Sequence, residues 1–374
     1  MARDGAFLYV ADTDNHALRR VNIERRVVTT VTGDGVQARW GKKGGKAGPV
    51  RLNSPWDVVF LEGRLYIAMA GSHQLWYFNP ADGKIDVFAG SGREDITDGS
   101  LGNAALAQPS GITTDGEYLY FADSETSSIR KVSPGDGMVT TLVGSGLFDF
   151  GHRDGTLKTA LLQHPLGVIW ADGALWVADT YNNRIKRLDE ASGRIVTVAG
   201  DTDDGLADGV GKAAQFDEPG GITFHEGHLY VADTNNHAVR IVDTLTGEVR
   251  TLRVRSVVTL SDNDPSFEVR MYPPAGFHIN EEAPSEITAV IEETGTNVPK
   301  RYTVLDSEML TAFFTFPADR TEATVELRGD LYVCKEGENA TCYIRPFTFV
   351  RSFRKANGAP DNPYVKHTVL PPQL

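Results

Sequence analysis

Short hydrophobic runs, many of them alternating with polar residues, fill the first two thirds of the chain and are separated by turns rich in glycine, asparagine and aspartate. Runs of this kind predict β-strands. One run returns five times, as LYVADT from Leu8, LYIAMA from Leu65, LYFADS from Leu119, LWVADT from Leu175 and LYVADT from Leu229. A period of 54 to 57 residues built from short strands indicates an array of small sheets and not one large core.

Four repeats are complete and share one order of elements. A strand that begins at a proline is followed by a short turn, the LYVAD strand, an alternating strand, a glycine turn and a fourth strand. Proline is tolerated at the first position of a strand, where no ladder N–H is needed. The prolines are Pro55, Pro109, Pro165 and Pro219. Four antiparallel strands per repeat predict the blade of a β-propeller, so the expected fold class is all-β.

The first repeat starts at its second strand, near Phe7, and no proline-led strand precedes it. Residues 1–252 are therefore expected to form five recognisable blades, the first incomplete, at about 1–33, 53–90, 107–144, 163–200 and 217–252. A closed propeller joins its last blade to its first. The pattern favours the C-terminal part of a longer propeller. The alternative is a small propeller closed by a downstream strand at 255–260.

The period stops after Leu252, and a different pattern of short strands predicts a β-sandwich domain at 253–356, with an extended proline-rich tail at 357–374. Cys334 and Cys342 flank a short loop and are expected to face each other across a hairpin. A disulfide is geometrically allowed there, but in a reducing cytosol two free thiols are expected. Asn339-Ala-Thr matches a glycosylation sequon.

Charge narrows the classes of function. The 374 residues contain 50 Asp and Glu against 37 Lys and Arg, a formal net charge of −13. An acidic surface argues against nucleic acid or an anionic membrane as the main partner. No apolar run reaches the roughly 18 residues of a membrane-spanning helix, and no signal peptide is visible. The expected location is therefore cytoplasmic.

Charged residues recur in pairs seven positions apart, and these pairs are Asp12 and Arg19, Asp123 and Arg130, Asp179 and Lys186, and Asp233 and Arg240. In the second repeat the two positions are Met69 and Trp76, so both charges are lost together. If the residues between them form a tight hairpin centred on Asn15-His16 or its equivalents, the two charges lie directly opposite each other. We interpret the aspartates as members of cross-strand ion pairs and not as catalysts.

Long interblade loops are expected on one face, together with the turns between the second and third strands, and these loops are 34–54, 91–108, 145–164 and 201–218. Long loops on a rigid scaffold are a usual place for function. Three loops share one spacing from Asp-Gly to proline, which favours a structural role. The first loop instead contains a basic segment, Gln37–Lys46, which we interpret as a solvated loop. The residues of the expected binding face are Asp57, His73, His164 and Arg153.

Three histidines share the turn position of their repeats: His16, His73 and His237. Converging histidines could ligate zinc, but turn chemistry explains them as well, because turn tips lie away from the propeller axis. Asp57 is the one charge where the other first strands have Gly111, Gly167 and Gly220-Gly221 facing the channel. No nucleophile elbow, phosphate-binding loop or zinc-protease motif is present, so neither a cofactor nor a metal site is predicted.

The blade pattern resembles the NHL repeat, a blade type of six-bladed propellers. The segments NSPWDVVF from Asn53, IAMAGSHQLW from Ile67, ADSETSSIR from Ala122 and ADTNNH from Ala232 resemble a narrower group. Its members carry an N-terminal thioredoxin-like domain, a six-bladed NHL propeller and a C-terminal β domain. The resemblance implies six blades, of which the first, like the thioredoxin-like domain, is absent from this sequence. The resemblance therefore assigns no redox cysteine to this sequence.

The leading functional interpretation is a non-catalytic scaffold that binds a protein or small ligand on its long-loop face and serves an attached thioredoxin-like domain. A second hypothesis is a metal-dependent lyase or lactonase-type hydrolase at the channel, using the histidines and Asp57, since some NHL-type enzymes such as the peptide-amidating lyases hold a metal there. A third is a ligand-sensing propeller.

Overall fold

The computed structural model describes residues 1–39, 44–48, 50–252, 257–261, 265–273, 277–305, 307–335, 341–356 and 363–368. Residues 40–43 of the basic segment Gln37–Lys46, and Asn339 of the glycosylation sequon, lie outside these residues. The chain divides into two compact units, Met1–Leu252 and Arg253–Leu374. The only helices among the described residues are four single 3-10 turns, η1 (Ala70–Ser72), η2 (Ser124–Thr126), η3 (Thr180–Asn182) and η4 (Gly211–Ala213).

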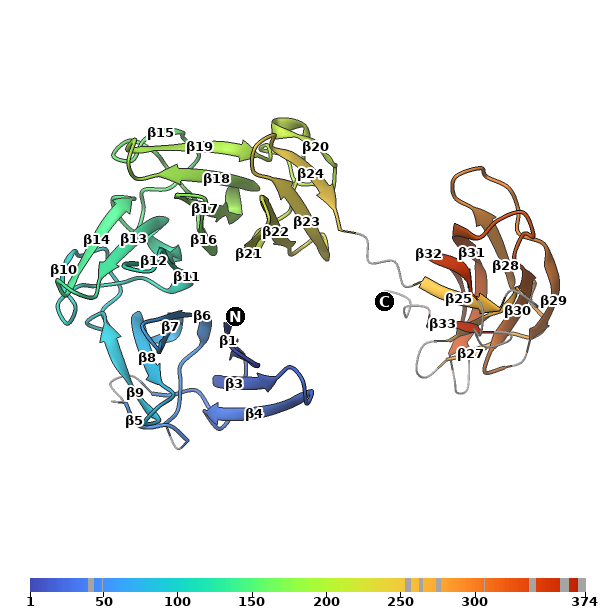
Figure 1. Ribbon diagram of the computed structural model, residues 1–374, viewed down its shortest axis with the longest axis horizontal. Helices are drawn as coiled ribbons and strands as arrows, with labels where there is room; N and C mark the ends of the chain where they lie inside the picture. Colours follow the sequence, from blue (N-terminus) through green and yellow to red (C-terminus); the bar gives the residue numbers. More distant parts are fainter. Residues whose placement is uncertain are drawn as a thin grey trace. The chain divides into compact units, whose positions relative to one another are not determined.

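In the described part of the first unit, each repeat forms one antiparallel sheet (Figure 1). The first sheet contains β1 (Ala2–Asp4), β2 (Phe7–Asp12), β3 (Ala17–Asn22) and β4 (Val27–Thr32). The second contains β5 (Gly45–Lys46), β6 (Pro55–Leu61), β7 (Arg64–Met69), β8 (Gln74–Asn79) and β9 (Lys84–Ala89).

The third, fourth and fifth sheets repeat the strand order of the second. The predicted fold class, an all-β propeller, is confirmed. The third contains β10 (Gly99–Ser100), β11 (Pro109–Thr114), β12 (Leu119–Asp123), β13 (Ser128–Ser133) and β14 (Met138–Val143). The fourth contains β15 (Gly155–Thr156), β16 (Gly167–Ala171), β17 (Ala174–Asp179), β18 (Arg184–Asp189) and β19 (Arg194–Ala199). The fifth contains β20 (Gly209–Val210), β21 (Pro219–His225), β22 (His228–Asp233), β23 (Ala238–Asp243) and β24 (Glu248–Thr251).

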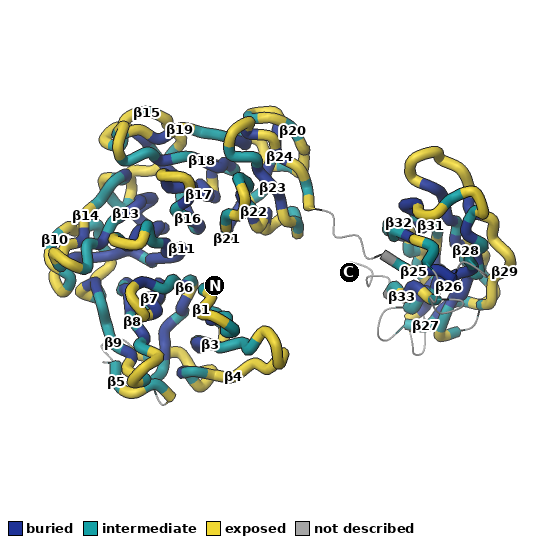
Figure 2. Tube along the Cα trace, viewed as in Figure 1, coloured by how far each residue is buried: buried dark blue, intermediate teal, exposed yellow. Residues whose placement is uncertain are grey.

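Each complete sheet has a short fifth strand that comes from the interblade loop before it. β10, for example, pairs with β14 at the outer edge, and the chain then crosses to the inner strand β11. The strands β7, β12 and β17 are buried along almost their whole length, whereas the loops at the outer edge are exposed (Figure 2). The interblade loop is therefore an integral part of the sheet that follows it.

The aromatic residue of each of the first four LYVAD strands packs against the next sheet. Tyr9 belongs to the core of the second sheet, Tyr66 to that of the third, Tyr120 to that of the fourth and Trp176 to that of the fifth. All four are at most 3% exposed. The recurring aromatic is thus the contact that joins successive blades.

Two expectations about the ends of the propeller are corrected by the structure. The first repeat does have an inner strand, because β1 pairs with β2, with Ala2 opposite Tyr9. What the first sheet lacks among the described residues is the short outer strand. The strand β25 (Val257–Ser261) does not close the ring, since it pairs with β32 (Cys342–Ala356) of the second unit.

Glycines near the start of the inner strands allow neighbouring sheets to approach closely. A Cβ added at Gly167 would lie 2.2 Å from the carbonyl oxygen of Gly220 in the next sheet, and one added at Gly111 would lie 2.6 Å from that of Leu166. Both contacts are with backbone atoms, which cannot rotate away. The glycines predicted to line the channel therefore serve close packing between inner strands.

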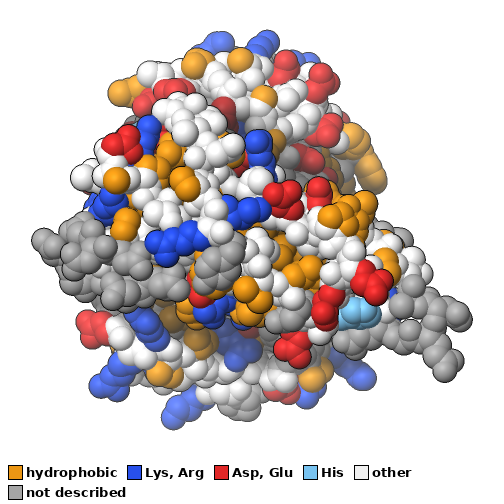
Figure 3. Space-filling view, turned by 90° about the vertical axis from the view of Figure 1, so that its right-hand side faces the viewer, with side chains coloured by type: hydrophobic (Ala, Val, Ile, Leu, Met, Phe, Trp, Pro, Cys, Tyr) orange, Lys and Arg blue, Asp and Glu red, His pale blue; other side chains and the backbone are white. Residues whose placement is uncertain are grey.

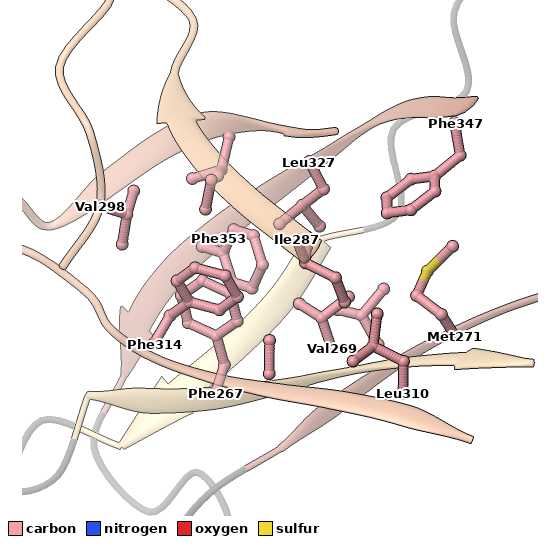
Figure 4. Packing of buried hydrophobic residues seen from close by; sticks show 14 of the residues in the cluster. Phe267, Val269, Met271, Ile287, Val298, Leu310, Phe314, Leu327, Phe347 and Phe353 are labelled. Carbon is pink, nitrogen blue, oxygen red and sulfur yellow. The ribbon is translucent and has the colours of Figure 1, made fainter. Parts of the chain in front are cut away.

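The second unit is a β-sandwich. One sheet contains β25, β32, β31 (Glu322–Lys335), β27 (Phe277–Ile279) and β28 (Glu286–Ile291), and the other contains β29 (Lys300–Leu305), β30 (Leu310–Thr315), β26 (Ser266–Tyr272) and β33 (Tyr364–Thr368). Phe267, Phe314 and Phe353 pack against one another between the sheets (Figure 4). The face drawn in Figure 3 has acidic and basic side chains interspersed with hydrophobic ones.

The tail expected at 357–374 is not separate from this domain. β33 pairs in parallel with β26, with Val365 opposite Val269, and Val365 is buried in the sandwich core. The domain therefore continues beyond residue 356, because a strand inside the proline-rich segment completes one of its sheets.

We expect Gly167→Ala to lower the free energy of unfolding of the propeller by about 1–3 kcal/mol, because the added methyl group meets a backbone carbonyl of the next sheet. Gly135→Ala is the matched control, since a Cβ there has no heavy atom within 4 Å. Urea denaturation of the two variants measures the difference. Equal midpoints would show that the inner strands can separate without cost.

Candidate functional site

A buried cation joins the second and third strands of a sheet to the loop that precedes that sheet. Arg130 is fully buried and donates to Asp123 at 3.1 Å, to the carbonyl oxygen of Ala105 at 2.6 Å and to Asp98 at 3.0 Å. Arg240 makes the same set of contacts, with Asp233, Gln215 and Asp208. The aspartate of the LYVAD strand also accepts a hydrogen bond from the loop backbone, as Asp123 does from Ala107 N. These charges fasten the loop to its sheet.

Lys186 performs this role in the fourth sheet. Its Nζ lies 3.6 Å from Asp179 and 2.9 Å from Asp154, and it contacts His152 Nδ1 at 3.0 Å. In the first sheet Arg19 binds Asp12 at 2.8 Å, and that pair is partly exposed. The hydrogen bond from Arg19 lowers the pKa of Asp12. The first pair therefore differs from the others in its access to water.

The register between the strands corrects one detail of the prediction. Asp123 lies opposite Ser128, and Arg130 lies opposite Phe121, so the two charges are diagonal neighbours and not directly opposite. The spacing of seven residues correctly places them on one face of the sheet, but the turn between β12 and β13 is longer than a two-residue hairpin because η2 intervenes. A long guanidinium reaches across the diagonal.

The sequence analysis missed the third member of this network. Asp98, Asp154 and Asp208 each bind the buried cation and also accept hydrogen bonds from a threonine in β14, β19 or β24, such as Thr141 in β14. In the second sheet this position is Gly44, where a Cβ would lie 2.1 Å from Ile85 O. In the second sheet all three charges are thus replaced together, by Gly44, Met69 and Trp76. Met69 Sδ accepts a hydrogen bond from Asn53 N there, as Asp123 accepts one from Ala107 N in the third sheet.

The histidines of the repeat turns act as hydrogen-bond acceptors between sheets. His16 Nδ1 accepts from Ser54 N at 3.1 Å, and His73 Nδ1 accepts from Gln108 N at 3.2 Å. Ser127 and Asn183 do the same in later sheets, toward His164 N and Glu218 N. All four acceptors have φ near +50°, as does His237, whose ring has no hydrogen-bond partner among the described residues. The turn residue thus links each sheet to the residue before the next proline.

The structure does not bring the remaining candidate residues together into one site. Asp57 Oδ2 accepts from Ile112 N at 3.2 Å and bridges the inner strands β6 and β11, while its other oxygen binds the amino group of Met1. Arg153 Nε donates to Thr159 O within its own loop. Among the described residues no three His, Cys, Asp or Glu side chains are placed to hold one metal ion.

Cys334 and Cys342 form a disulfide, so the expectation of two free thiols is corrected. The residues are directly paired across the hairpin of β31 and β32, with Cα atoms 4.0 Å apart. The pairing follows from strand register, which sequence spacing alone suggests but does not fix.

Three exposed aromatic residues on the long-loop face, Phe148, Phe150 and Tyr181, escaped the sequence analysis, and His164 of the expected binding face contacts one of them. Phe148 is 88% exposed and Phe150 is 55% exposed, and Tyr181 stacks on the ring of His164 at 4.5 Å. Asn182 Nδ2 donates to Gly151 O at 2.9 Å, which holds the Tyr181 turn beside the Phe150 segment. We call these four residues, Phe148, Phe150, Tyr181 and His164, the aromatic cluster.

The sequence contains one signal of the aromatic cluster, which is a difference in the length of the interblade loops. Asp154 follows Gly144 by ten positions, whereas Asp98 follows Gly90, and Asp208 follows Gly200, by eight. The two additional residues lie in the segment that carries both phenylalanines. A departure from the repeat therefore marks the aromatic cluster.

We expect Asp123→Ala to lower the free energy of unfolding by about 3 kcal/mol, because it removes one carboxylate from a buried guanidinium and leaves a loop N–H without its acceptor. Asp12→Ala, at the partly exposed pair, is expected to cost about 1 kcal/mol or less. Chemical denaturation measures both. The triple variant Asp98→Gly, Asp123→Met, Arg130→Trp, which copies the second sheet, should recover part of the loss. Equal costs at the two aspartates would contradict a buried network.

Burial lowers the pKa of His73 and of His164, and lowers that of His152 to about 4. A lowered pKa in the folded state gives stability that is present above about pH 6.5 and is lost as the pH falls below it. Burial raises the pKa of Asp123 to about 6 and acts with the opposite sign, so stability from that group is lost as the pH rises through 6. The two effects partly cancel in the whole protein.

The contribution of His73 can be isolated with His73→Asn, which keeps an acceptor that Asn183 shows to be suitable. We expect this variant to lose less stability than the wild type between pH 7.5 and pH 5.0, by urea denaturation at each pH. His225→Asn, at an exposed histidine, should leave the loss unchanged. An unchanged loss in His73→Asn would contradict the assigned role.

Comparison with known proteins gives matches along the whole chain. The family model for the NHL repeat matches residues 216–242. Protein SUPPRESSOR OF QUENCHING 1, chloroplastic, of Arabidopsis thaliana is 35% identical over 97% of this chain and 38% of its own length. NHL repeat-containing protein 2 of Homo sapiens is 40% identical over 66% of this chain and 39% of its own length. The chain thus spans less than two fifths of the length of these relatives.

A solved structure of a Bacteroides thetaiotaomicron protein of unknown function is 21% identical, with a TM-score of 0.40, and covers 52% of this chain and 45% of its own. That similarity is too low to support an argument. In the part of the chain that the structure describes, no helix is long and apolar enough to cross a membrane. The Arabidopsis relative is named as chloroplastic, so the expected cytoplasmic location is not confirmed.

The family resemblance inferred from the repeat motifs is therefore confirmed. The sheets built from single repeats, the NHL-repeat match and the two relatives agree, and the chain belongs to the NHL-repeat β-propeller proteins related to NHL repeat-containing protein 2 and SUPPRESSOR OF QUENCHING 1.

Proposed function

We propose that this propeller is a non-catalytic scaffold that binds a partner protein through its long-loop face. The aromatic cluster carries this proposal. Exposed aromatic residues are enriched at the centres of protein interfaces, where they supply large contact areas with few rotatable bonds. Single exposed hydrophobic residues are ordinary, but two exposed phenylalanines on one loop, fastened beside the turn of an exposed tyrosine, are not.

The surroundings of the aromatic cluster indicate the kind of partner. The next interblade loop on the same face contains Asp201, Asp203 and Asp204 beside the exposed Leu206. Asp149 lies between the two phenylalanines. An apolar group bordered by carboxylates fits a protein surface with aliphatic or aromatic side chains bordered by Lys and Arg.

The repeat residues themselves support a scaffold role. The aspartates and cations that recur in the sheets are used to fasten loops, and the turn acceptors His16, His73, Ser127 and Asn183 link successive sheets. Residues whose polar groups make such contacts hold the loops in fixed positions, as a binding scaffold requires. The sandwich, the C-terminal β domain of the family pattern, is a second module on the same chain.

We further propose that the full-length protein carries a thioredoxin-like domain that this scaffold serves. The support is the family resemblance and the length of the relatives, of which this chain covers 38–39%. The hypothesis of a metal-dependent lyase or hydrolase has less support, because His16, His73 and His237 lie on separate sheets. His16 and His73 also use their Nδ1 atoms to accept backbone hydrogen bonds. A ligand-sensing role is compatible with the same face.

Photo-cross-linking tests this proposal. We expect benzoylphenylalanine in place of Phe148 to capture a defined protein from an extract of the source organism, identified by mass spectrometry. The same group in place of Leu245, which is 95% exposed at the opposite end of the strands, is the control. Excess wild-type chain should compete, and excess Phe148→Ala, Phe150→Ala double variant should not. Capture of the same proteins from both positions would refute the assignment of the face.

A further inference from the structure

A cavity of about 250 Å³ lies between the first and second sheets. It is bounded by β3 and β4 on one side and by β8 and the turn after it on the other (Figure 1). Its lining includes Tyr9, Arg20, Ala47, Phe78 and Pro80, all of them described residues. It is distant along the chain from the aromatic cluster and shares no residue with it.

A missing side chain opens this space. Ala47 occupies the position of Leu101, Leu157 and Gly211 in the later interblade loops, because each of the four donates its backbone N–H to the glycine of the turn between the third and fourth strands. Two of the three later loops therefore have a leucine at this position. Leu157 packs against the core that contains Tyr120. At Ala47 the corresponding volume is not filled by the loop.

The interface between the third and fourth sheets shows what the residues equivalent to Tyr9 and Arg20 bind. Lys131 lies opposite Tyr120 in the strand register, and both reach one carboxylate of the next sheet. Lys131 Nζ donates to Glu190 Oε1 at 2.8 Å, and the Tyr120 hydroxyl donates to Glu190 Oε2 at 3.2 Å. Glu190 directly follows β18, the third strand of its sheet.

The first interface has the same cation and hydroxyl but not the carboxylate. Arg20 lies opposite Tyr9, as Lys131 lies opposite Tyr120. The residue directly after β8 is Pro80, which stands where Glu190 stands after β18. Among the described residues neither the Arg20 guanidinium nor the Tyr9 hydroxyl has a hydrogen-bond or ion-pair partner, and Arg20 lies over the ring of Phe7 at 4.8 Å.

We propose that the cavity binds a small organic carboxylate. Its carboxylate would accept hydrogen bonds from Arg20 and Tyr9, in the place that Glu190 fills two sheets later. Its apolar part would lie against Phe78 and Pro80, in the volume left by Ala47. A guanidinium matches a carboxylate in geometry as well as charge, and a nearly buried tyrosine hydroxyl gains by obtaining a partner.

The size of the cavity limits the ligand. Its volume lies at or below the lower end of the roughly 300–1,000 Å³ that is usual for drug-sized ligands. A monocarboxylate with a single ring or a short branched chain fits this space. Dinucleotides and peptides of several residues do not.

The experiment uses the full chain and 4-fluorophenylacetate as the probe, observed by fluorine NMR. We expect saturable binding, competition by phenylacetate and at least tenfold weaker competition by the uncharged phenylacetamide. Arg20→Gln should weaken binding at least tenfold. Ala47→Leu, which copies Leu157, should abolish binding while keeping or raising the melting temperature.

Arg187→Gln is the matched control, because Arg187 has the same register position in the fourth sheet and is paired with Asp189. It should leave probe binding unchanged. Pro80→Glu supplies an internal carboxylate and should abolish binding as well. The proposal is overturned by a lack of saturable binding, by equal competition from the amide, or by binding that survives Ala47→Leu in a folded variant.

Discussion

A four-stranded sheet cannot bury both of its faces alone, and the propeller depends on how each sheet is covered by the next. The aromatic residue of the LYVAD strand takes part in this covering, as Tyr66 shows in the core of the third sheet. The inner strands can come close enough because residues such as Gly167 have no side chain. The loop between two sheets must then cross the end of the second one, and its position is fixed by buried charge.

The sequence was sufficient to predict the fold because its landmarks are local. The proline before a strand, the alternation within it and the glycine after it each report on a few neighbouring residues. The strand β1 was missed because three residues, Ala2–Asp4, carry too little pattern, and only pairing with β2 defines them. β33 was missed for a similar reason, since Tyr364–Thr368 lies among prolines and its partner β26 is distant in sequence.

Recurrence proved to be a guide to structure more than to binding. The histidines and aspartates were candidate site residues because they repeat, and in the structure their side chains connect sheets and loops. Phe148 and Phe150 do not repeat, and Ala47 departs from the leucine found at Leu101 and Leu157, so shared positions do not identify them. The longer loop that carries both phenylalanines can be found in the sequence, whereas the equivalence of Ala47 and Leu157 follows from the hydrogen bonds within the sheets.

The three-residue network around each buried cation constrains how such a blade can change over time. A carboxyl group left alone in the interior can bind a proton and become neutral, but a guanidinium cannot give its proton up. A lineage that lost Asp123 first would keep a permanent charge without its buried counter-ion, whereas one that lost Arg130 first would not. The substitution path to a blade with Gly44, Met69 and Trp76 should therefore have begun at the cation, and ancestral sequences should contain aspartate pairs without it.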